Sequence, residues 1–170
     1  NLNRQILYNE QDIGKLKVQV AREKLISLNS EVQIEIFPEM LDVNNAQAII
    51  QNFDIVVDCT DNLEVRYLID DVCTMLKKPM IYGALHKFQG QVSVFHYPDA
   101  EGKSYSYRDL FPENPAAEQI PPCAETGVLG VMPGIIGTIQ AAQALKIILG
   151  FGEILIGKLF IFDVKHLTSM

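Results

Sequence analysis

The stretch DIVVDCTDNLEVRYLIDDVCTMLKKPMIYGAL, residues 54–85, decides the fold of this chain. It opens with an apolar run at 55–57 between two aspartates, which is typical of a strand buried on both faces. Apolar residues at helical spacing follow over 65–76, and the helix that they predict ends before Pro79. Another apolar run at 80–85 predicts a second buried strand. Strand, helix and strand in this order predict two parallel strands of an α/β sheet.

Three further elements are predicted before this stretch. Apolar residues at helical spacing over 18–28 predict a helix, and alternation in VQIEIF at 32–37 predicts a strand. The segment NNAQAIIQNF then reads as a short helix, capped by Asn44 or Asn45.

After residue 85 the pattern changes. GQVSVFHYP at 90–98 alternates imperfectly after a short linker, and we expect an antiparallel strand there. Residues 99–122 are rich in proline and have no period, so they predict a long loop. The segment 133–150 starts with proline and ends with glycine, as a helix should. Its apolar residues run nearly all the way round this predicted helix, which predicts burial in the core or in a subunit interface. KLFIFDV at 158–164 predicts a last strand.

Length and composition predict one globular domain, because 170 residues with 48% hydrophobic side chains suffice for one packed core. The formal net charge of −7 argues against binding to nucleic acid or to an anionic membrane, and no uninterrupted apolar stretch has the length of a membrane span. Cys59, Cys73 and Cys123 form no C-x-x-C pair, which favours a reducing compartment, the cytoplasm. We expect Cys59 and Cys73 to pack in the core.

Two aspartates stand where the strand at 55–57 ends. Ligands of open parallel sheets bind at the carboxyl ends of strands, so Asp58 and Asp61 are candidates for holding Mg²⁺, which prefers one or two carboxylates together with substrate phosphates. In the alternative, Asp58 only ends the strand, and Asp61 or Asn62 caps the helix that follows. The residues alone leave both interpretations open.

Three basic residues and a cysteine are further candidates. Arg4 and Lys17 stand near the start of a predicted helix, where a basic side chain is usually only solvated, and Arg66 by itself reads as a surface or salt-bridge residue. Cys123 follows the long loop and precedes a glycine-rich run. It would be a nucleophile if exposed beside positive charge, and is otherwise a small apolar residue.

Five short motifs stand in order along almost the whole chain. They are N-L-N-R-Q at 1–5, I-G-K-L-K at 13–17, D-C-T-D-N at 58–62 with Arg66, G-x(6)-G-Q-V-S-V-F at 83–95 and C-x-E-T-G-V at 123–128. Together they resemble the ubiquitin-activating-enzyme superfamily, and within it the HesA/MoeB/ThiF-type adenylyltransferases of sulfur-carrier proteins. The resemblance implies a Rossmann-like, mostly parallel sheet with an antiparallel extension, in one ThiF-like domain over 1–170.

The resemblance implies an ATP-dependent adenylyltransferase. Its substrate would be the C-terminal glycine of a ubiquitin-like sulfur-carrier protein ending in Gly-Gly, in molybdopterin or thiamine biosynthesis. The terminal carboxylate would attack the α-phosphorus of ATP and give an acyl adenylate and pyrophosphate. Because an α-carboxyl with a pKa of about 3.5 is already ionised at neutral pH, no general base is needed. Positive groups fixed in place beforehand would stabilise the charge on the phosphates.

The resemblance also implies roles for single residues. Arg4 and Lys17 match the family's phosphate-contacting pair, and we expect them to converge with Asp61, which matches its Mg²⁺-binding aspartate. Asn1 matches a polar residue beside the triphosphate, and Asn62 would bind the cofactor next to Asp61. The helix over 133–150 would serve the family's homodimer, and Cys123 matches a position where some members have a reactive cysteine.

Two departures from the family pattern change these expectations. Ser106 and Asp109 stand where the family has half of a four-cysteine zinc site, and serine is a poor zinc ligand, so we expect no zinc. The family's first βαβ nucleotide-binding unit, with its glycine-rich phosphate loop, precedes N-L-N-R-Q and is absent from these 170 residues. We therefore expect a fragment that binds ATP weakly or not at all by itself.

Two other classes of function compete with this interpretation. A non-catalytic superfamily member would act as the inactive partner of a heterodimer, but it would have no need for Arg4, Lys17 and Asp61. A nicotinamide-dependent Rossmann enzyme would need a proton-transfer residue facing its cofactor and no cation-binding aspartate. Nucleotide binding that depends on Mg²⁺ separates this last class from an adenylyltransferase.

Overall fold

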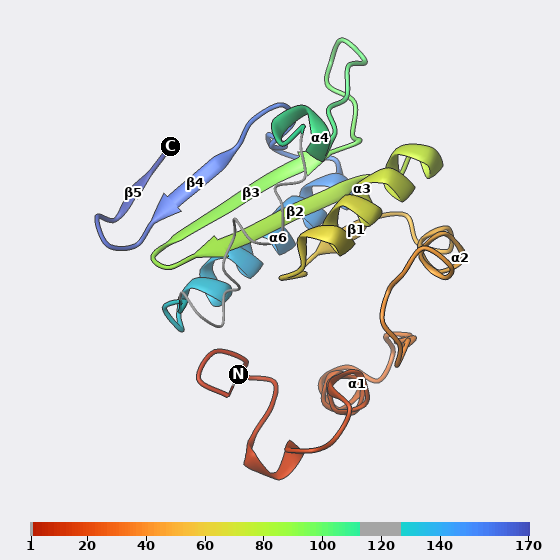
Figure 1. Ribbon diagram of the computed structural model, residues 1–170, viewed down its shortest axis with the longest axis vertical. Helices are drawn as coiled ribbons and strands as arrows, with labels where there is room; N and C mark the ends of the chain where they lie inside the picture. The colour runs from red at the N-terminus through yellow and green to blue at the C-terminus, as the bar shows by residue number, and fades with distance from the viewer. Residues whose placement is uncertain (1, 113–126) are drawn as a thin grey trace. The chain divides into compact units, whose positions relative to one another are not determined.

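The computed structural model describes residues 2–112 and 127–170, and the chain divides into two compact units (Figure 1). We call Asn1–Met40 the N-terminal unit and Leu41–Met170 the sheet unit. The elements in chain order are η1 Glu10–Asp12, α1 Lys17–Leu28, α2 Ala46–Ile50, β1 Val56–Asp58, α3 Leu63–Leu76, β2 Met80–His86, β3 Gln89–Phe95, α4 Tyr107–Leu110, α6 Met132–Leu149, β4 Phe160–Asp163 and β5 Thr168–Ser169. A single domain over 1–170 stays a prediction.

In the N-terminal unit, the side chain of Asp12 joins η1 to α1. Its carboxylate accepts a hydrogen bond from the main-chain N of Asn9 at 3.0 Å and forms an ion pair with Nζ of Lys24 at 2.6 Å. The Lys24 ammonium is the main reason why the pKa of Asp12 falls to about 2. The predicted helix after Gly14 is confirmed as α1.

The predicted strand at 32–37 is wrong. The segment has no regular structure, and none of its residues pairs with a strand of the described sheet. The carbonyl oxygen of Ile34 instead accepts from Nε of Arg22 on α1, at 3.2 Å. Alternation alone predicts a strand only where a neighbouring strand completes the hydrogen-bond ladder.

In its described residues, the sheet unit contains five strands in the order β1-β2-β3-β4-β5. The pair β1 and β2 is parallel, joined through α3, and the three other pairs are antiparallel. The predicted α/β fold with an antiparallel extension is therefore confirmed, but the described sheet is mixed and not mostly parallel as predicted, because one of its four strand pairs is parallel. The short strand β5 is an element that the sequence did not predict.

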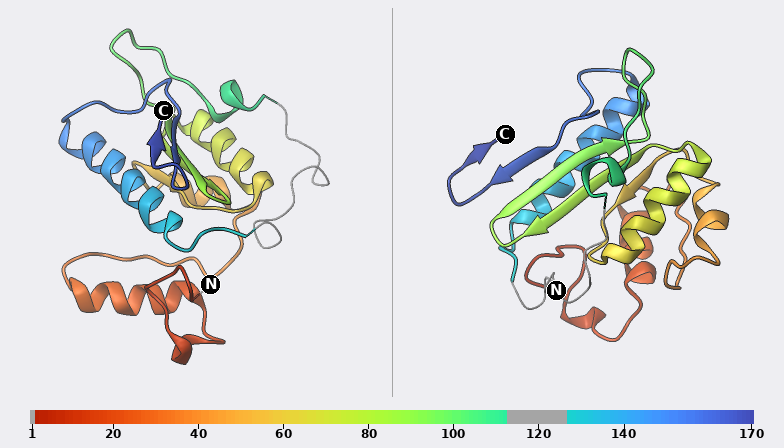
Figure 2. Two further views of the ribbon diagram at one scale, coloured as in Figure 1. Left: turned by 90° about the vertical axis from the view of Figure 1, so that its left-hand side faces the viewer. Right: turned by 45° about the horizontal axis from the view of Figure 1, so that its top comes forward.

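Helices cover the sheet on both faces, α3 on one and α6 on the other (Figure 2). The α3 side holds an aromatic core in which the rings of Tyr82 and Tyr107 lie 5.4 Å apart. On the α6 side, Val92 packs against Met132 and Ile136. Two cores on opposite faces keep the middle of the sheet buried, as the apolar run at 80–85 predicted.

Local signals set the ends of α3. Asn62 caps its first turn by accepting from the main-chain N of Val65 at 3.2 Å. At the other end Lys77 has the left-handed conformation, with φ 52°, and Pro79 follows. The predicted helix is confirmed, and its buried face includes two charged residues, Arg66 and Asp70.

The long helix α6 is confirmed, with Pro133 in its first turn and Gly150 closing it at φ 65°. One face of α6 is buried in the core, as predicted, whereas Ile148 and Leu149 are exposed in the single chain, and burial of that face in a subunit interface stays a prediction. By length and composition α6 could cross a membrane, contrary to the expectation that no segment reaches that length. Core helices pass the same test, and the buried face of α6 packs on β2 and β3.

Two other expectations are corrected. The strand β1 is not buried on both faces, since the side chain of Val57 is 44% exposed. The predicted loop over 99–122 contains the short helix α4, which begins at a capping box of Ser106 and Asp109. The short helix near residue 46 is confirmed as α2, but the carboxylate of Asp42, not an asparagine side chain, accepts from the main-chain N of residues 44 and 45.

Candidate functional site

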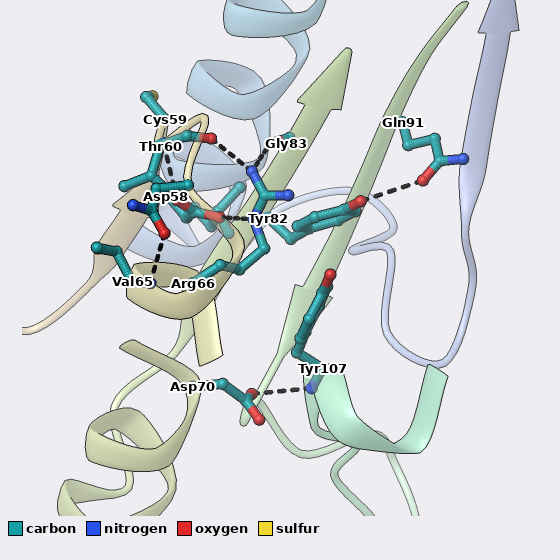
Figure 3. A network of polar contacts seen from close by, with 12 residues as sticks. Asp58, Cys59, Thr60, Val65, Arg66, Asp70, Tyr82, Gly83, Gln91 and Tyr107 are labelled. Atoms are coloured by element: carbon teal, nitrogen blue, oxygen red, sulfur yellow. Dashed lines mark hydrogen bonds and ion pairs between the residues drawn. The ribbon is translucent and has the colours of Figure 1, made fainter. Parts of the chain in front are cut away.

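The residues after β1 fold back onto its last residue, Asp58, which is buried (Figure 3). Oδ1 of Asp58 accepts from the main-chain N of Thr60 at 2.9 Å and from its hydroxyl at 2.6 Å. Oδ2 accepts from Nε of Arg66 at 2.6 Å. Because both carboxylate oxygens are engaged by the protein, Asp58 is not the free cation ligand that one interpretation of the sequence allowed.

Arg66 reaches this turn from α3. Its Nη2 donates to the carbonyl oxygens of Thr60 at 2.6 Å and Gly83 at 3.2 Å, and its guanidinium lies 5.0 Å from the centre of the Tyr82 ring. Burial, the largest single effect, lowers the pKa of Arg66, but the charge and hydrogen bond of Asp58 together with the nearby tyrosines outweigh it, so the pKa of the guanidinium is raised. The side chain is 7% exposed, which confirms a salt-bridge residue and makes the surface alternative wrong.

Gln140 reaches the same strand ends from the opposite face of the sheet. Its Nε2 donates to the carbonyl oxygens of Asp58 at 2.8 Å and Ile81 at 3.2 Å, so it joins the ends of β1 and β2. Gly83 makes room for this amide, because a Cβ at position 83 would lie within 3.0 Å of it. Gly90 leaves the same room for a side chain of α6. The two glycines of the motif at 83–95 thus let α6 pack closely on the sheet.

Asp61 follows this turn and is exposed. Its carboxylate forms no hydrogen bond or ion pair with any residue in the described part of the chain. Asn62 caps α3, as the alternative interpretation allowed, so Asp61 is not the cap. A carboxylate without a protein partner, at the carboxyl end of a parallel strand, is free to bind a ligand there.

The N-terminal unit carries Arg4 and Lys17. As predicted, Lys17 is the first residue of α1, and its exposed ammonium pairs with no acid within residues 2–112 and 127–170. Nη1 of Arg4 donates to Oδ1 of the neighbouring Asn3 at 3.3 Å. A hollow of about 220 Å³ lies beside Lys17, with Tyr8 and Lys15 among its other lining residues. The convergence of these two cations with Asp61 stays a prediction.

Asn1 and Cys123, two other predicted site residues, lie outside the described residues. Ser106 and Asp109, at the positions of the family's zinc cysteines, bond to each other across the first turn of α4, where the main-chain N of Ser106 lowers the pKa of Asp109. Over 2–112 and 127–170, no group of three or more His, Cys, Asp or Glu side chains is placed to hold a metal ion. The absence of zinc stays an expectation.

The two described cysteines differ. Cys73 is fully buried, as predicted, and burial raises its pKa to about 12. Cys59 is exposed, so its predicted place in the core is wrong, because β1 ends one residue before it. Although the residue is exposed, partial desolvation of its sulfur by the surrounding protein raises the pKa of the Cys59 thiol.

Three polar residues with structural roles were not found from the sequence. They are Thr60, Gln140 and Asp70, whose Oδ1 contacts Nε2 of His96 at 2.7 Å and accepts from the main-chain N of Tyr107 at 2.8 Å. Asp70 and Gln140 occupy buried positions of their helices, where Arg66 on α3 and Gln143 on α6 are the other buried polar side chains. Polar residues at such positions are a signal that sequence reasoning can use, because a buried polar group needs a partner.

Comparison of the sequence with known proteins identifies a family and several relatives. A family model described as the ThiF family matches residues 1–170. A sulfur carrier protein adenylyltransferase of Thermus thermophilus is 44% identical over 164 residues, which cover 96% of this chain and 60% of the relative. A probable adenylyltransferase/sulfurtransferase MoeZ of Mycobacterium tuberculosis is 34% identical over 168 residues, covering 99% of this chain and 43% of the relative.

Solved structures share the fold at low sequence identity. The crystal structure of Escherichia coli MccB superposes with a TM-score of 0.80 at 16% identity, over 99% of this chain and 50% of that one. PaaA superposes with a TM-score of 0.77 at 21% identity, over 100% of this chain and 51% of that one. The chain thus spans about half the length of these structures.

Proposed function

This chain belongs to the ThiF family, and from that premise we propose that it forms part of an ATP-dependent adenylyltransferase. Relatives that are named adenylyltransferases match nearly all of it, while the chain spans 60% of the Thermus thermophilus relative and less of the others. The acceptor in this proposal is the C-terminal glycine of a ubiquitin-like sulfur-carrier protein. The reaction forms a bond from the terminal carboxylate to the α-phosphorus and releases pyrophosphate.

The exposed carboxylate of Asp61 is the observation that carries the proposal. It lies three positions after the last residue of β1, near the end of a parallel strand where ligands of such sheets bind. Its neighbours before and after have other tasks, since Thr60 bonds to Asp58 and Asn62 caps α3. Among the polar side chains of residues 58–62, that of Asp61 alone has no hydrogen bond to the described part of the chain, and it is free for a ligand.

Asp61 suits Mg²⁺, a hard cation that binds through one or two carboxylates plus substrate phosphates. Its carboxylate oxygens lack protein donors within the described residues, whereas both oxygens of Asp58 have them. A magnesium ion held by Asp61 would neutralise charge on the ATP phosphates. We assign this ligand role to Asp61 and not to Asp58.

Arg4 and Lys17 supply positive charge in this proposal. The reaction brings a carboxylate to a polyphosphate, so two anions approach, and charge builds up on the departing pyrophosphate. Preorganised cations reduce that barrier, and removing one such group commonly costs on the order of a hundredfold in rate. Lys17 is suited to this task because its ammonium is exposed and pairs with no described acid, in contrast to Lys15, which lies 3.4 Å from Asp12.

We further propose a homodimer in the cytoplasm. The exposed apolar side chains at the end of α6, Leu145, Ile148 and Leu149, support a partner surface. Sedimentation of the natural full-length protein tests this, with Ile148→Glu expected to give monomers and Thr138→Glu, elsewhere on α6, as the control. An unchanged mass for Ile148→Glu would remove this face of α6 from the interface.

ATP–pyrophosphate exchange by the natural full-length protein tests the adenylation. Exchange should require a Gly-Gly-terminated sulfur carrier, and a carrier without its last glycine is the substrate control. Lys17→Ala should reduce the exchange on the order of a hundredfold. Lys15→Ala, two positions away, should leave it nearly unchanged. A folded protein that binds ATP but gives no exchange with any such carrier would be better explained as a non-catalytic partner.

A further inference from the structure

The turn that leads to Asp61 is held by side chains from two faces of the sheet, Arg66 from α3 (Figure 3) and Gln140 from α6. Thr60, directly before Asp61, has all of its polar groups engaged, because Asp58 accepts from its N and hydroxyl and Arg66 donates to its carbonyl oxygen. The carbonyl oxygen of Asp58 is in turn bonded to Gln140 on α6. The backbone that leads into Asp61 is therefore fixed on both sides.

Arg66 is the residue that connects these bonds. One guanidinium donates to the Asp58 carboxylate, to Thr60 and to Gly83, at 2.6, 2.6 and 3.2 Å. Its flat face lies over Tyr82, which limits rotation of the group. The planar fork of arginine can serve several acceptors in fixed directions, which a lysine ammonium cannot do from the same position.

From this geometry we propose that Arg66 is a positioning residue, which sets the conformation of the 58–61 turn so that Asp61 presents its carboxylate to a metal-bound nucleotide. Arg66 itself contacts neither metal nor nucleotide in this role. The inference rests on the proposed function, because it assumes that Asp61 is the metal ligand. Groups that orient a metal ligand commonly change metal affinity tenfold or more when they are replaced.

A competing explanation is that Arg66 only stabilises the fold. A structural role would weaken every property of the site together, whereas a positioning role should weaken metal-dependent binding and leave metal-free nucleotide binding unchanged. The difference between these two affinities is therefore the readout that separates the explanations.

Arg66→Lys is the decisive variant, because lysine keeps the charge beside Asp58 and loses the fork. Arg108→Lys is its matched control. Arg108 also forms a two-bond pair with an aspartate of α3, Asp71, and lies over a tyrosine ring, but it does not touch the 58–61 turn.

The experiment measures the Kd of Mn²⁺ with a non-hydrolysable ATP analogue on the natural full-length protein, by water-proton relaxation, and the Kd of the analogue alone in EDTA. Arg66→Lys should raise the Kd measured with Mn²⁺ about tenfold and leave the Kd of the analogue in EDTA unchanged. Arg108→Lys should change neither. An Arg66→Lys protein that behaves like Arg108→Lys, or that loses both affinities equally, overturns the proposal.

Two more variants complete the test. If Arg66→Lys does not fold, Thr60→Val decides, because it removes the hydroxyl bond to Asp58 and keeps the ion pair. A raised Kd for Mn²⁺ in Thr60→Val supports the positioning role, and an unchanged Kd overturns it. Asp61→Asn separates the positioning role of Arg66 from the metal-ligand role of Asp61. An unchanged Mn²⁺ affinity in this variant would mean that the proposed function has assigned the wrong ligand.

Discussion

The amide of Gln140 lies so close to Gly83 that a Cβ at position 83 would come within 3.0 Å of it. The amide cannot simply move aside, because its Nε2 donates to the carbonyl oxygens of Asp58 and Ile81. Glycine at position 83 is thus a condition for the bond between α6 and the end of β1. The spacing of the motif at 83–95 therefore has a packing cause.

We expect Gly83→Ala to destabilise the protein by about 1–3 kcal/mol, the usual cost of overpacking a buried contact. Urea unfolding of the natural full-length protein measures the free energy. Gly137→Ala is the matched control, since a Cβ there would meet nothing within 4 Å, and alanine should stabilise the interior of α6 by up to about 1 kcal/mol. Equal stability of the two variants would show that the Gln140 amide is not held in place.

Asp61→Ala should abolish metal-dependent exchange and leave the fold intact. The residue is exposed and its side chain bonds to nothing in the described part of the chain, so its removal should change the free energy of unfolding by about 0.5 kcal/mol or less. Glu64→Ala, an exposed acid three positions later, is the control and should retain activity. Loss of folding in Asp61→Ala would instead indicate a structural role.

Arg66→Met should cost about 3–5 kcal/mol of stability, because it leaves the buried carboxylate of Asp58 without its counter-charge. The exposed pair of Arg108 and Asp71 offers the comparison, with side chains 44% and 54% exposed. Arg108→Met should cost about 1 kcal/mol or less, as exposed ion pairs do. Thermal unfolding of both variants tests the contrast, and similar losses would contradict it.

The stability of the N-terminal unit should fall in acid through Asp12. Its pKa is lowered from 3.8 to about 2, chiefly by Lys24, so the folded state binds the proton more weakly than the unfolded state. The stabilisation is complete above about pH 4 and is lost as the pH falls toward 2. Asp12→Asn should remove this part of the pH dependence, measured by hydrogen exchange of the amides of α1, and an unchanged profile would assign it to other acids.

Much of the fold could be predicted because its signals are local. The apolar runs of β1 and β2 and the period and ends of α3 all lie within the 32 residues at 54–85, and a strand, a helix and a strand in that order have few ways to pack. The predictions that failed depend on which other segments lie beside a given segment in the folded chain. Residues 32–37 alternate like a strand but pair with none in the described sheet, and Cys59 follows an apolar run but is exposed.

The candidate site, too, could be predicted only in part from the sequence. The sequence pointed to Asp58 and Asp61 as equal candidates, and to Asn62 or Asp61 as the cap. The structure separates them, because Arg66 and Thr60 occupy the oxygens of Asp58 and Asn62 takes the cap. Arg66 and Asp58 are eight positions apart, but only burial against Tyr82 turns this spacing into a fixed ion pair.

By itself, then, the sequence determined the succession β1, α3 and β2 with its parallel strand pair and the motifs of the ThiF family, since periodicity, caps and short motifs are properties of neighbouring residues. The tertiary structure alone decided which carboxylate is free, why position 83 is glycine and how α6 holds the end of β1. The bond from Gln140 to Asp58 spans 82 positions, and no local pattern encodes a contact that exists only after the helix has packed on the sheet.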